Sequence, residues 1–169
     1  EQIIIATGSE PLDILSLPCD HQLICNSTSI LELTELPKTL VIVGGGYIGC
    51  EFASLFADLK VKVIILEALD SIVINQGKSI SEALTRAFQK KGIEIQTNVK
   101  VVGIDKQESC LRIRLEGDKE LFCDKALIAI GRKLVSNGLG LEKIGVALDK
   151  KGAIVVNEKM QTNLDGIYA

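Results

Sequence analysis

The stretch VIVGGGYIGCE, residues 41–51, decides the fold of this 169-residue chain, and it runs from apolar residues directly into glycine. Glycine inside a regular element costs about 0.5–1 kcal/mol relative to alanine. Four glycines within residues 44–49 therefore need a structural reason. Gly44, Gly46 and Gly49 form the pattern G-x-G-x-x-G after a strand-like run and before a helical pattern. That context predicts a dinucleotide-binding turn, in preference to a purely structural glycine turn.

Each motif glycine has an expected task. Gly44 permits the tight turn out of the strand, Gly46 lets the backbone approach a pyrophosphate, and Gly49 lets the helix lie close to the sheet. The pyrophosphate would sit on the free N–H groups and the positive end of the helix dipole. Gly45 lies inside the predicted binding turn, but its motif position assigns it no task of its own.

An acidic residue completes the expected motif. Glu67 ends the apolar run VKVIILE, close to the roughly 20 residues after the first glycine that the motif requires. Its carboxylate would accept hydrogen bonds from both adenosine ribose hydroxyls and repel a 2′-phosphate. No Lys or Arg occurs in residues 68–76, which favours NAD over NADP; the alternative is a surface glutamate without a ligand. Glu51 is open to two interpretations, as an acid at a helix N-terminus or as a contact to the nicotinamide-side ribose.

Hydrophobic periodicity predicts an α/β fold. The runs alternate as strand, helix, strand, helix, strand, typical of a doubly wound, Rossmann-like unit with a parallel sheet. Short alternating runs then predict an inserted antiparallel β-meander at about 99–124, followed by a buried strand. The expected strands are 3–6, 40–43, 61–66, 93–95, 100–105, 111–115, 120–123, 124–131, 154–156 and 166–168; the expected helices are 46–58 and 79–91, with a helical turn at 29–35.

The composition argues against several classes of function. The net charge of −3 and the 4% aromatic content give no case for nucleic acid or for an anionic membrane surface, and no apolar run reaches the roughly 18 residues of a membrane helix. Five cysteines without CxxC spacing and one histidine make no metal site, so reduced thiols in a cytosol-like compartment are expected. Both ends are expected to be cut from a longer chain.

Six motifs, taken in order, resemble the flavin-dependent pyridine nucleotide–disulfide oxidoreductases, and among them the dihydrolipoyl dehydrogenases most. They are IIIATGSEP, VIVGGGYIGCEFA, VIILEALD, ALIAIGR, GLGLEKIGV and TNLDGIYA. The resemblance implies a central NAD-binding domain at 36–135, with FAD-domain remnants and connectors at 1–35 and 136–169. It also implies FAD in the full-length parent, a dimerisation domain, a 2-oxo acid dehydrogenase complex as partner, and a bacterial cytoplasm or mitochondrial matrix as location.

The resemblance carries over to individual residues. It implies that residues 44–51 wrap the pyrophosphate and nicotinamide ribose, with Tyr47 and Ile48 near the nicotinamide. It places Val101 beside the adenine and Gly131 at the carboxamide end. It makes Thr7 and Gly8 neighbours of FAD. Lys133-Leu134 stands where the family usually has Arg-Pro, which puts the local turn geometry in question.

Other family features are absent from these residues: the FAD-binding GxGxxG, the redox-active CxxxxC, the FAD-contacting GD pair and the C-terminal His–Glu pair. Cys19 and Cys25 have the wrong spacing for the redox pair. No catalytic residue is therefore predicted, and the isolated chain is expected to lack turnover. The alternatives are the same domain of another disulfide reductase or an NADH oxidase, and a stand-alone nucleotide-binding module.

Overall fold

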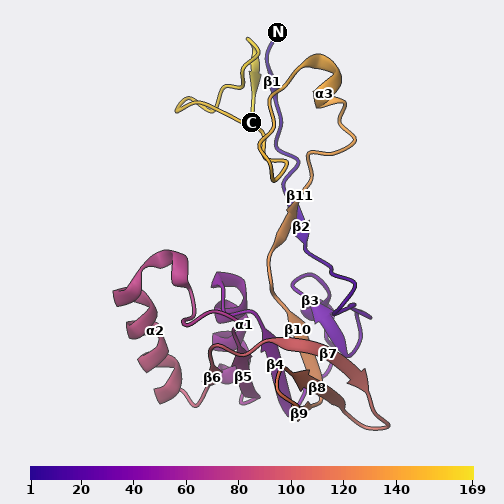
Figure 1. The fold of residues 1–169 in the computed structure, drawn as a ribbon, viewed down its shortest axis with the longest axis vertical. Helices are drawn as coiled ribbons and strands as arrows, with labels where there is room; N and C mark the ends of the chain where they lie inside the picture. The colour runs from indigo at the N-terminus through magenta and orange to yellow at the C-terminus, as the bar shows by residue number, and fades with distance from the viewer. The chain divides into compact units, whose positions relative to one another are not determined.

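The computed structural model describes all 169 residues, which divide into two compact units (Figure 1). The larger unit is one continuous stretch, Pro11–Gly131. The smaller unit combines Glu1–Glu10 with Arg132–Ala169.

A five-stranded parallel sheet forms the centre of the larger unit. Its strand order is β3-β10-β4-β5-β6, and every pair in it is parallel. The bounds are β3 (Ile24–Asn26), β10 (Lys125–Ile128), β4 (Thr39–Val43), β5 (Lys62–Leu66) and β6 (Glu94–Gln96). The residues at 40–43 and 63–66 are buried throughout, as a parallel sheet covered on both faces requires. The predicted α/β class with a parallel sheet is confirmed.

Both long helices cover the same face of this sheet. Helix α1 (Tyr47–Asp58) packs on β4 and β5, and α2 (Lys78–Lys90) packs on β6 and the 3₁₀ turn η2 (Ile74–Gln76). Alternate strand residues such as Leu40 and Ile42 meet Phe56 and Phe88 in one core cluster. The expectation of a doubly wound unit, with helices on both faces, is therefore wrong: successive right-handed crossovers toward the same sheet edge place both helices on one side.

The opposite face is covered by the antiparallel meander. Its strands are β7 (Val101–Lys106), β8 (Leu111–Leu115) and β9 (Lys119–Cys123), in the order β7-β8-β9. The buried side of β8 packs in a second core cluster with the sheet residues Val41, Val43, Ile64 and Leu66. The inserted meander that the alternating runs predicted is confirmed as the second covering layer.

Strand β3 was not expected from the sequence. All three of its residues are buried, and they pair with β10 at the edge of the sheet. Asp20 holds the preceding turn, since its Oδ1 accepts hydrogen bonds at 2.8 Å from the N–H groups of Gln22, Leu23 and Ile24. Burial opposes ionisation of Asp20, but Lys106, 2.7 Å away, and these N–H donors outweigh it and hold its pKa at about 2.

The compact unit that contains the parallel sheet begins at Pro11, so it includes residues 11–35. The domain bounds 36–135 implied by the family resemblance stay a prediction. A three-residue strand between turns, such as β3, is too short to show a periodicity of its own, so no sequence pattern predicts it.

The smaller unit contains only short elements. Strand β1 (Ile3–Ile4) pairs in parallel with β12 (Ile167–Tyr168), β2 (Ser9–Pro11) pairs with β11 (Arg132–Leu134), and α3 spans Leu141–Ile144. The strand expected at 154–156 is reduced to a bridge between Leu148 and Ile154. No helix of the structure has the length and apolar character needed to cross a bilayer.

Because the meander covers one face of the sheet, substitutions on its buried side and on its exposed side should differ in their effect on stability. Ile113 is fully buried against the sheet, and Phe122 is 58% exposed. We expect Ile113→Ala to lower the free energy of unfolding by about 2–5 kcal/mol because it leaves a cavity. Phe122→Ala is the control and should cost less than about 1 kcal/mol. Urea denaturation measures both; equal losses would contradict the assignment of the meander as a core layer.

Candidate functional site

The segments that carry predicted site residues follow three neighbouring strands of the parallel sheet, at the edge where these strands end. Val43, at the end of β4, is in register with Leu66 of β5 on one side and with Ile128 of β10 on the other. The glycine turn follows β4 and Glu67 follows β5, while Gly131 lies three residues beyond β10. The chain leaves β4 toward β5 and returns through β10 on the other side. Such a topological switch point is where open α/β sheets bind ligands.

Two motif glycines are required by backbone packing alone. Gly44 has φ = +110°, and a Cβ there would lie 2.4 Å from the carbonyl oxygen of Ala129. Its N–H donates to the carbonyl of Leu66 at 2.8 Å. A Cβ on Gly49 would lie 2.0 Å from the carbonyl oxygen of Gly44. The turn is therefore pressed between β10 on one side and helix α1 on the other, with no room for side chains.

Gly46 is different, because a Cβ on it would meet no atom within 4 Å. It is the N-cap of α1, with φ = −71° and no side-chain cap on the helix. The first-turn N–H groups of an α-helix have no partner inside the helix, so they remain available to an anion. Tyr47, the first residue of α1, is 61% exposed, and Ile48 beside it is half-buried. Gly46 thus combines open space, free N–H donors and the positive end of the helix dipole, which are the features an anion site needs.

The Glu67 carboxylate is fixed by two backbone donors. Its Oε2 accepts the N–H of Gly45 at 2.6 Å, and its Oε1 accepts the N–H of Leu69 at 2.8 Å. A carboxylate oxygen can accept two hydrogen bonds, so each retains capacity for another donor. The two carboxylate oxygens together are suited to bind a vicinal diol such as that of a ribose. Sequence reasoning identified Glu67 but missed Leu69, whose contribution is a backbone N–H and leaves no mark on residue type.

The loop after β6 is attached to the same region. The N–H of Asn98 donates to the carbonyl of Leu69 at 2.8 Å, and that of Val99 donates to the carbonyl of Glu67 at 3.0 Å. The loop leads directly into Val101, the half-buried first residue of β7. Glu51 is exposed on α1, one turn beyond Gly46. The structure thus joins Gly45 to Glu67 directly at this edge, with Gly44, Gly46, Tyr47, Ile48 and Gly49 in the same turn and helix start, while Glu51 follows on α1, Val101 begins β7 and Gly131 follows β10.

Thr7 and Gly8 belong to the smaller unit instead. The Thr7 hydroxyl donates to the carbonyl of Val135, and the N–H of Val135 donates to the carbonyl of Gly8 at 3.1 Å. Lys133, one of the residues that replace the family's usual Arg-Pro, lies in β11 and forms an ion pair with Glu10 at 3.0 Å. The departure from the family pattern therefore falls in a strand rather than in a turn.

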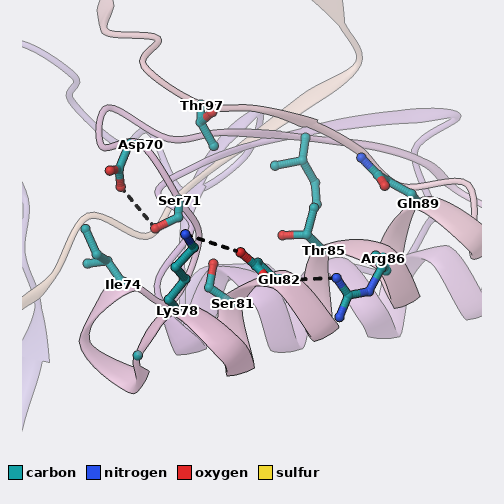
Figure 2. Close-up of a pocket in the computed structure, with 12 residues that line it drawn as sticks. Asp70, Ser71, Ile74, Lys78, Ser81, Glu82, Thr85, Arg86, Gln89 and Thr97 are labelled. Atoms are coloured by element: carbon teal, nitrogen blue, oxygen red, sulfur yellow. Dashed lines mark hydrogen bonds and ion pairs between the residues drawn. The ribbon is translucent and has the colours of Figure 1, made fainter.

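A cavity of about 660 Å³, drawn in Figure 2, has a lining that does not include Glu67. It is formed by α2, the loop from Asp70 to Gly77 and the residues Ile95 and Thr97. Two of its lining cations, Lys78 and Arg86, flank Glu82 at 3.8 and 3.9 Å (Figure 2), and Asp70 brings the formal charge of the lining to zero. None of the glycine-turn residues lines it, and the candidate dinucleotide site is the open sheet edge.

Cys50 lies directly behind the glycine turn. It is buried, and its Sγ donates to the carbonyl of Gly45 at 3.5 Å. Burial, reinforced by the negative charge of Glu67, raises the pKa of the Cys50 thiol to about 12. All five cysteines are free, and Cys25 and Cys123 are buried as well. Cys50 is therefore a neutral packing group near neutral pH, without the thiolate character that redox chemistry needs.

Comparison with known proteins defines the class. The family described as pyridine nucleotide-disulphide oxidoreductase matches residues 1–169. The chain belongs to this family, as its motifs indicated. Members of the family use FAD and NAD(P).

Two relatives within the family are similar to the chain over its whole length. The chain is 44% identical over 167 residues to dihydrolipoyl dehydrogenase of Chlamydia pneumoniae, and the aligned region covers 99% of this chain and 36% of the relative. It is 40% identical over 171 residues to dihydrolipoyl dehydrogenase of Bacillus subtilis, covering 100% of the chain and 37% of the relative. The chain thus spans little more than a third of these relatives' length.

A solved structure shows the same similarity in three dimensions. The HOCl-induced flavoprotein disulfide reductase of Escherichia coli superposes with a TM-score of 0.86 at 34% identity. The match covers 99% of this chain and 38% of that one.

The buried thiol behind the turn predicts a loss of stability at alkaline pH. The pKa of Cys50 rises from its ordinary 9.0 to about 12 on folding, so between these values the unfolded chain binds fewer protons and stability falls with pH. From pH 8 to pH 10 this one thiol should remove about 1.4 kcal/mol. Urea denaturation at both pH values should show a loss smaller by that amount in Cys50→Ala; equal losses in both proteins would contradict it.

Proposed function

We propose that this chain is the NAD-binding part of a dihydrolipoyl dehydrogenase. The observation that carries the proposal is the pairing of two features on one sheet edge: a carboxylate held by backbone N–H groups at Glu67, and an open helix N-terminus at Gly46. The first suits an adenosine ribose and the second suits a pyrophosphate. Relatives of that name at 40–44% identity support the particular enzyme.

In this proposal, the dinucleotide lies along the carboxyl edge of the sheet. Glu67 accepts hydrogen bonds from the adenine ribose, and the segment 68–76, without Lys or Arg, offers no partner to a 2′-phosphate. The N–H groups after Gly46 bind the pyrophosphate, and Val101 borders the adenine. Tyr47, Ile48, Glu51 and Gly131 then surround the nicotinamide end.

The contribution of this chain to catalysis is placement. FAD, held by other parts of such an enzyme together with Thr7 and Gly8, would exchange a hydride with the bound nicotinamide. Holding the two rings in fixed proximity makes that transfer effectively intramolecular. No side chain of this chain needs to move a proton, so we expect the 169 residues alone to bind NAD(H) without turnover.

The wider setting follows from the same proposal. The complete enzyme would oxidise dihydrolipoamide with NAD, carry a dimerisation domain, and serve a 2-oxo acid dehydrogenase complex. The free thiols fit a reducing compartment, either the bacterial cytoplasm or the mitochondrial matrix. The similarity to a flavoprotein disulfide reductase supports a second candidate, in which the same domain serves another disulfide substrate.

Coenzyme preference tests the role of Glu67. Calorimetric titration of the chain should show tighter binding of NADH than of NADPH. Glu67→Ala should weaken NADH binding by about 1.5–3 kcal/mol, because charge-assisted hydrogen bonds to the ribose are lost. Glu116→Ala, which removes a carboxylate from an exposed turn of the meander, is the control and should leave NADH affinity unchanged. Equal affinities for NADH and NADPH in the unsubstituted chain would refute the assignment.

The open space at Gly46 predicts a separation of binding from stability. Because a Cβ there meets no protein atom and φ is −71°, Gly46→Ala should change the free energy of unfolding by less than about 1 kcal/mol. The same methyl group would occupy the position of the approaching pyrophosphate, so NADH affinity should fall at least about tenfold. Unchanged NADH affinity in a normally folded variant would place the pyrophosphate elsewhere.

A further inference from the structure

We infer that Gly45, the unassigned "x" residue of the glycine motif, is a positioning residue. Its peptide group and its lack of a side chain hold the Glu67 carboxylate in the orientation that binds the ribose and disfavours a 2′-phosphate. The inference rests on the proposed function and adds a second determinant of coenzyme selectivity to Glu67 itself.

The first argument is the hydrogen bond from Gly45 to Glu67. At 2.6 Å from the Gly45 nitrogen to Oε2, it is short for an N–H donor and a charged acceptor. The partner bond from the Leu69 N–H to Oε1 is local, two residues away. The bond from Gly45 spans 22 residues, from the end of β4 to the end of β5. It is therefore the contact that relates the carboxylate to the pyrophosphate-binding turn.

The second argument is space. A Cβ on Gly45 would lie 2.7 Å from Cγ2 of Ile72, 3.2 Å from Oε2 of Glu67 and 3.3 Å from its Cβ. Ile72 is fully buried in the core cluster under the helices, so it has little freedom to withdraw. Glu67 is only half-buried and would be the residue displaced. Gly45, unlike Gly44, does not have a positive φ, so close packing and not backbone conformation excludes a side chain.

The third argument is that the carbonyl group of Gly45, in the peptide that follows it, is held as well. The carbonyl accepts the N–H of Val73 at 2.8 Å and the thiol of Cys50 at 3.5 Å. Val73 adopts a left-handed conformation, φ = 43° and ψ = 39°, which is unfavourable for a β-branched residue. The surrounding contacts must hold it there. Helix α1 and the loop after β5 thus both hold the peptide that follows Gly45, while Glu67 accepts the N–H of the peptide that precedes it, so the Gly45 backbone is held from both sides.

A double-mutant cycle tests the inference on the whole 169-residue chain. The proteins are the unsubstituted chain, Gly45→Ala, Glu67→Ala and the double variant, each titrated with NADH and NADPH. If Gly45 acts through Glu67, Gly45→Ala should weaken NADH binding about tenfold and NADPH binding less than about threefold. In the Glu67→Ala background, the same substitution should weaken NADH binding less than about twofold.

The outcomes are distinct. Equal weakening by Gly45→Ala in both backgrounds, or an unchanged preference between NADH and NADPH, means a merely structural role and overturns the inference while the proposed function stands. Absence of NADH binding to the unsubstituted chain overturns the proposed function and the inference with it.

A second measurement applies even if Gly45→Ala does not fold. In amide NMR spectra at pH 7, the Gly45 proton should resonate further downfield in the unsubstituted chain than in Glu67→Gln, because a hydrogen bond to a charged acceptor is the stronger one. A Gly45 proton at the same position in both proteins overturns the inference.

Discussion

Direct contact of backbone with backbone where β4 ends is the constraint on which the site depends. The peptide of Gly44 lies against Ala129 at the end of β10, and Gly49 at the start of α1 lies against Gly44. These contacts leave no room for a Cβ, so the strand, the turn and the helix approach more closely than side chains would allow. The helix N-terminus consequently emerges at the sheet edge itself, beside the residue that ends β5.

The two coverings of the sheet explain why this edge can be held so firmly. Side chains of β4 and β5 alternate between a cluster under the two helices and a cluster under the meander. Each strand is anchored from both faces, and neither can shift along the other without moving apolar groups out of both cores. The carboxyl ends of the strands therefore hold their register, and the short hydrogen bond between Gly45 and Glu67 becomes a fixed feature.

Sequence patterns predicted the elements that are long, periodic or chemically marked. The amphipathic α2 and the alternation of β8 each carry a period that only one kind of element satisfies, and the short apolar runs of β4 and β5, bounded by turn residues, are typical of buried parallel strands. The glycine spacing and Glu67 carry chemistry in their residue types. By contrast, β3 is three residues long, and its burial arises from its partner β10, far along the chain. Leu69 contributes only a peptide N–H, and Gly45 contributes a peptide N–H and the absence of a side chain, which a motif cannot distinguish from a spacer.

The larger unit also enters and leaves its fold at one point. The N–H of Leu12, next to its first residue, donates to the carbonyl of Gly131, its last, at 3.1 Å. A unit whose ends meet can be inserted into a loop of another chain without separating the residues on either side of the insertion. Its sheet, helices and meander all lie between those two ends, so it brings its own core with it. The closeness of its two ends is the geometry that makes domain insertion tolerable.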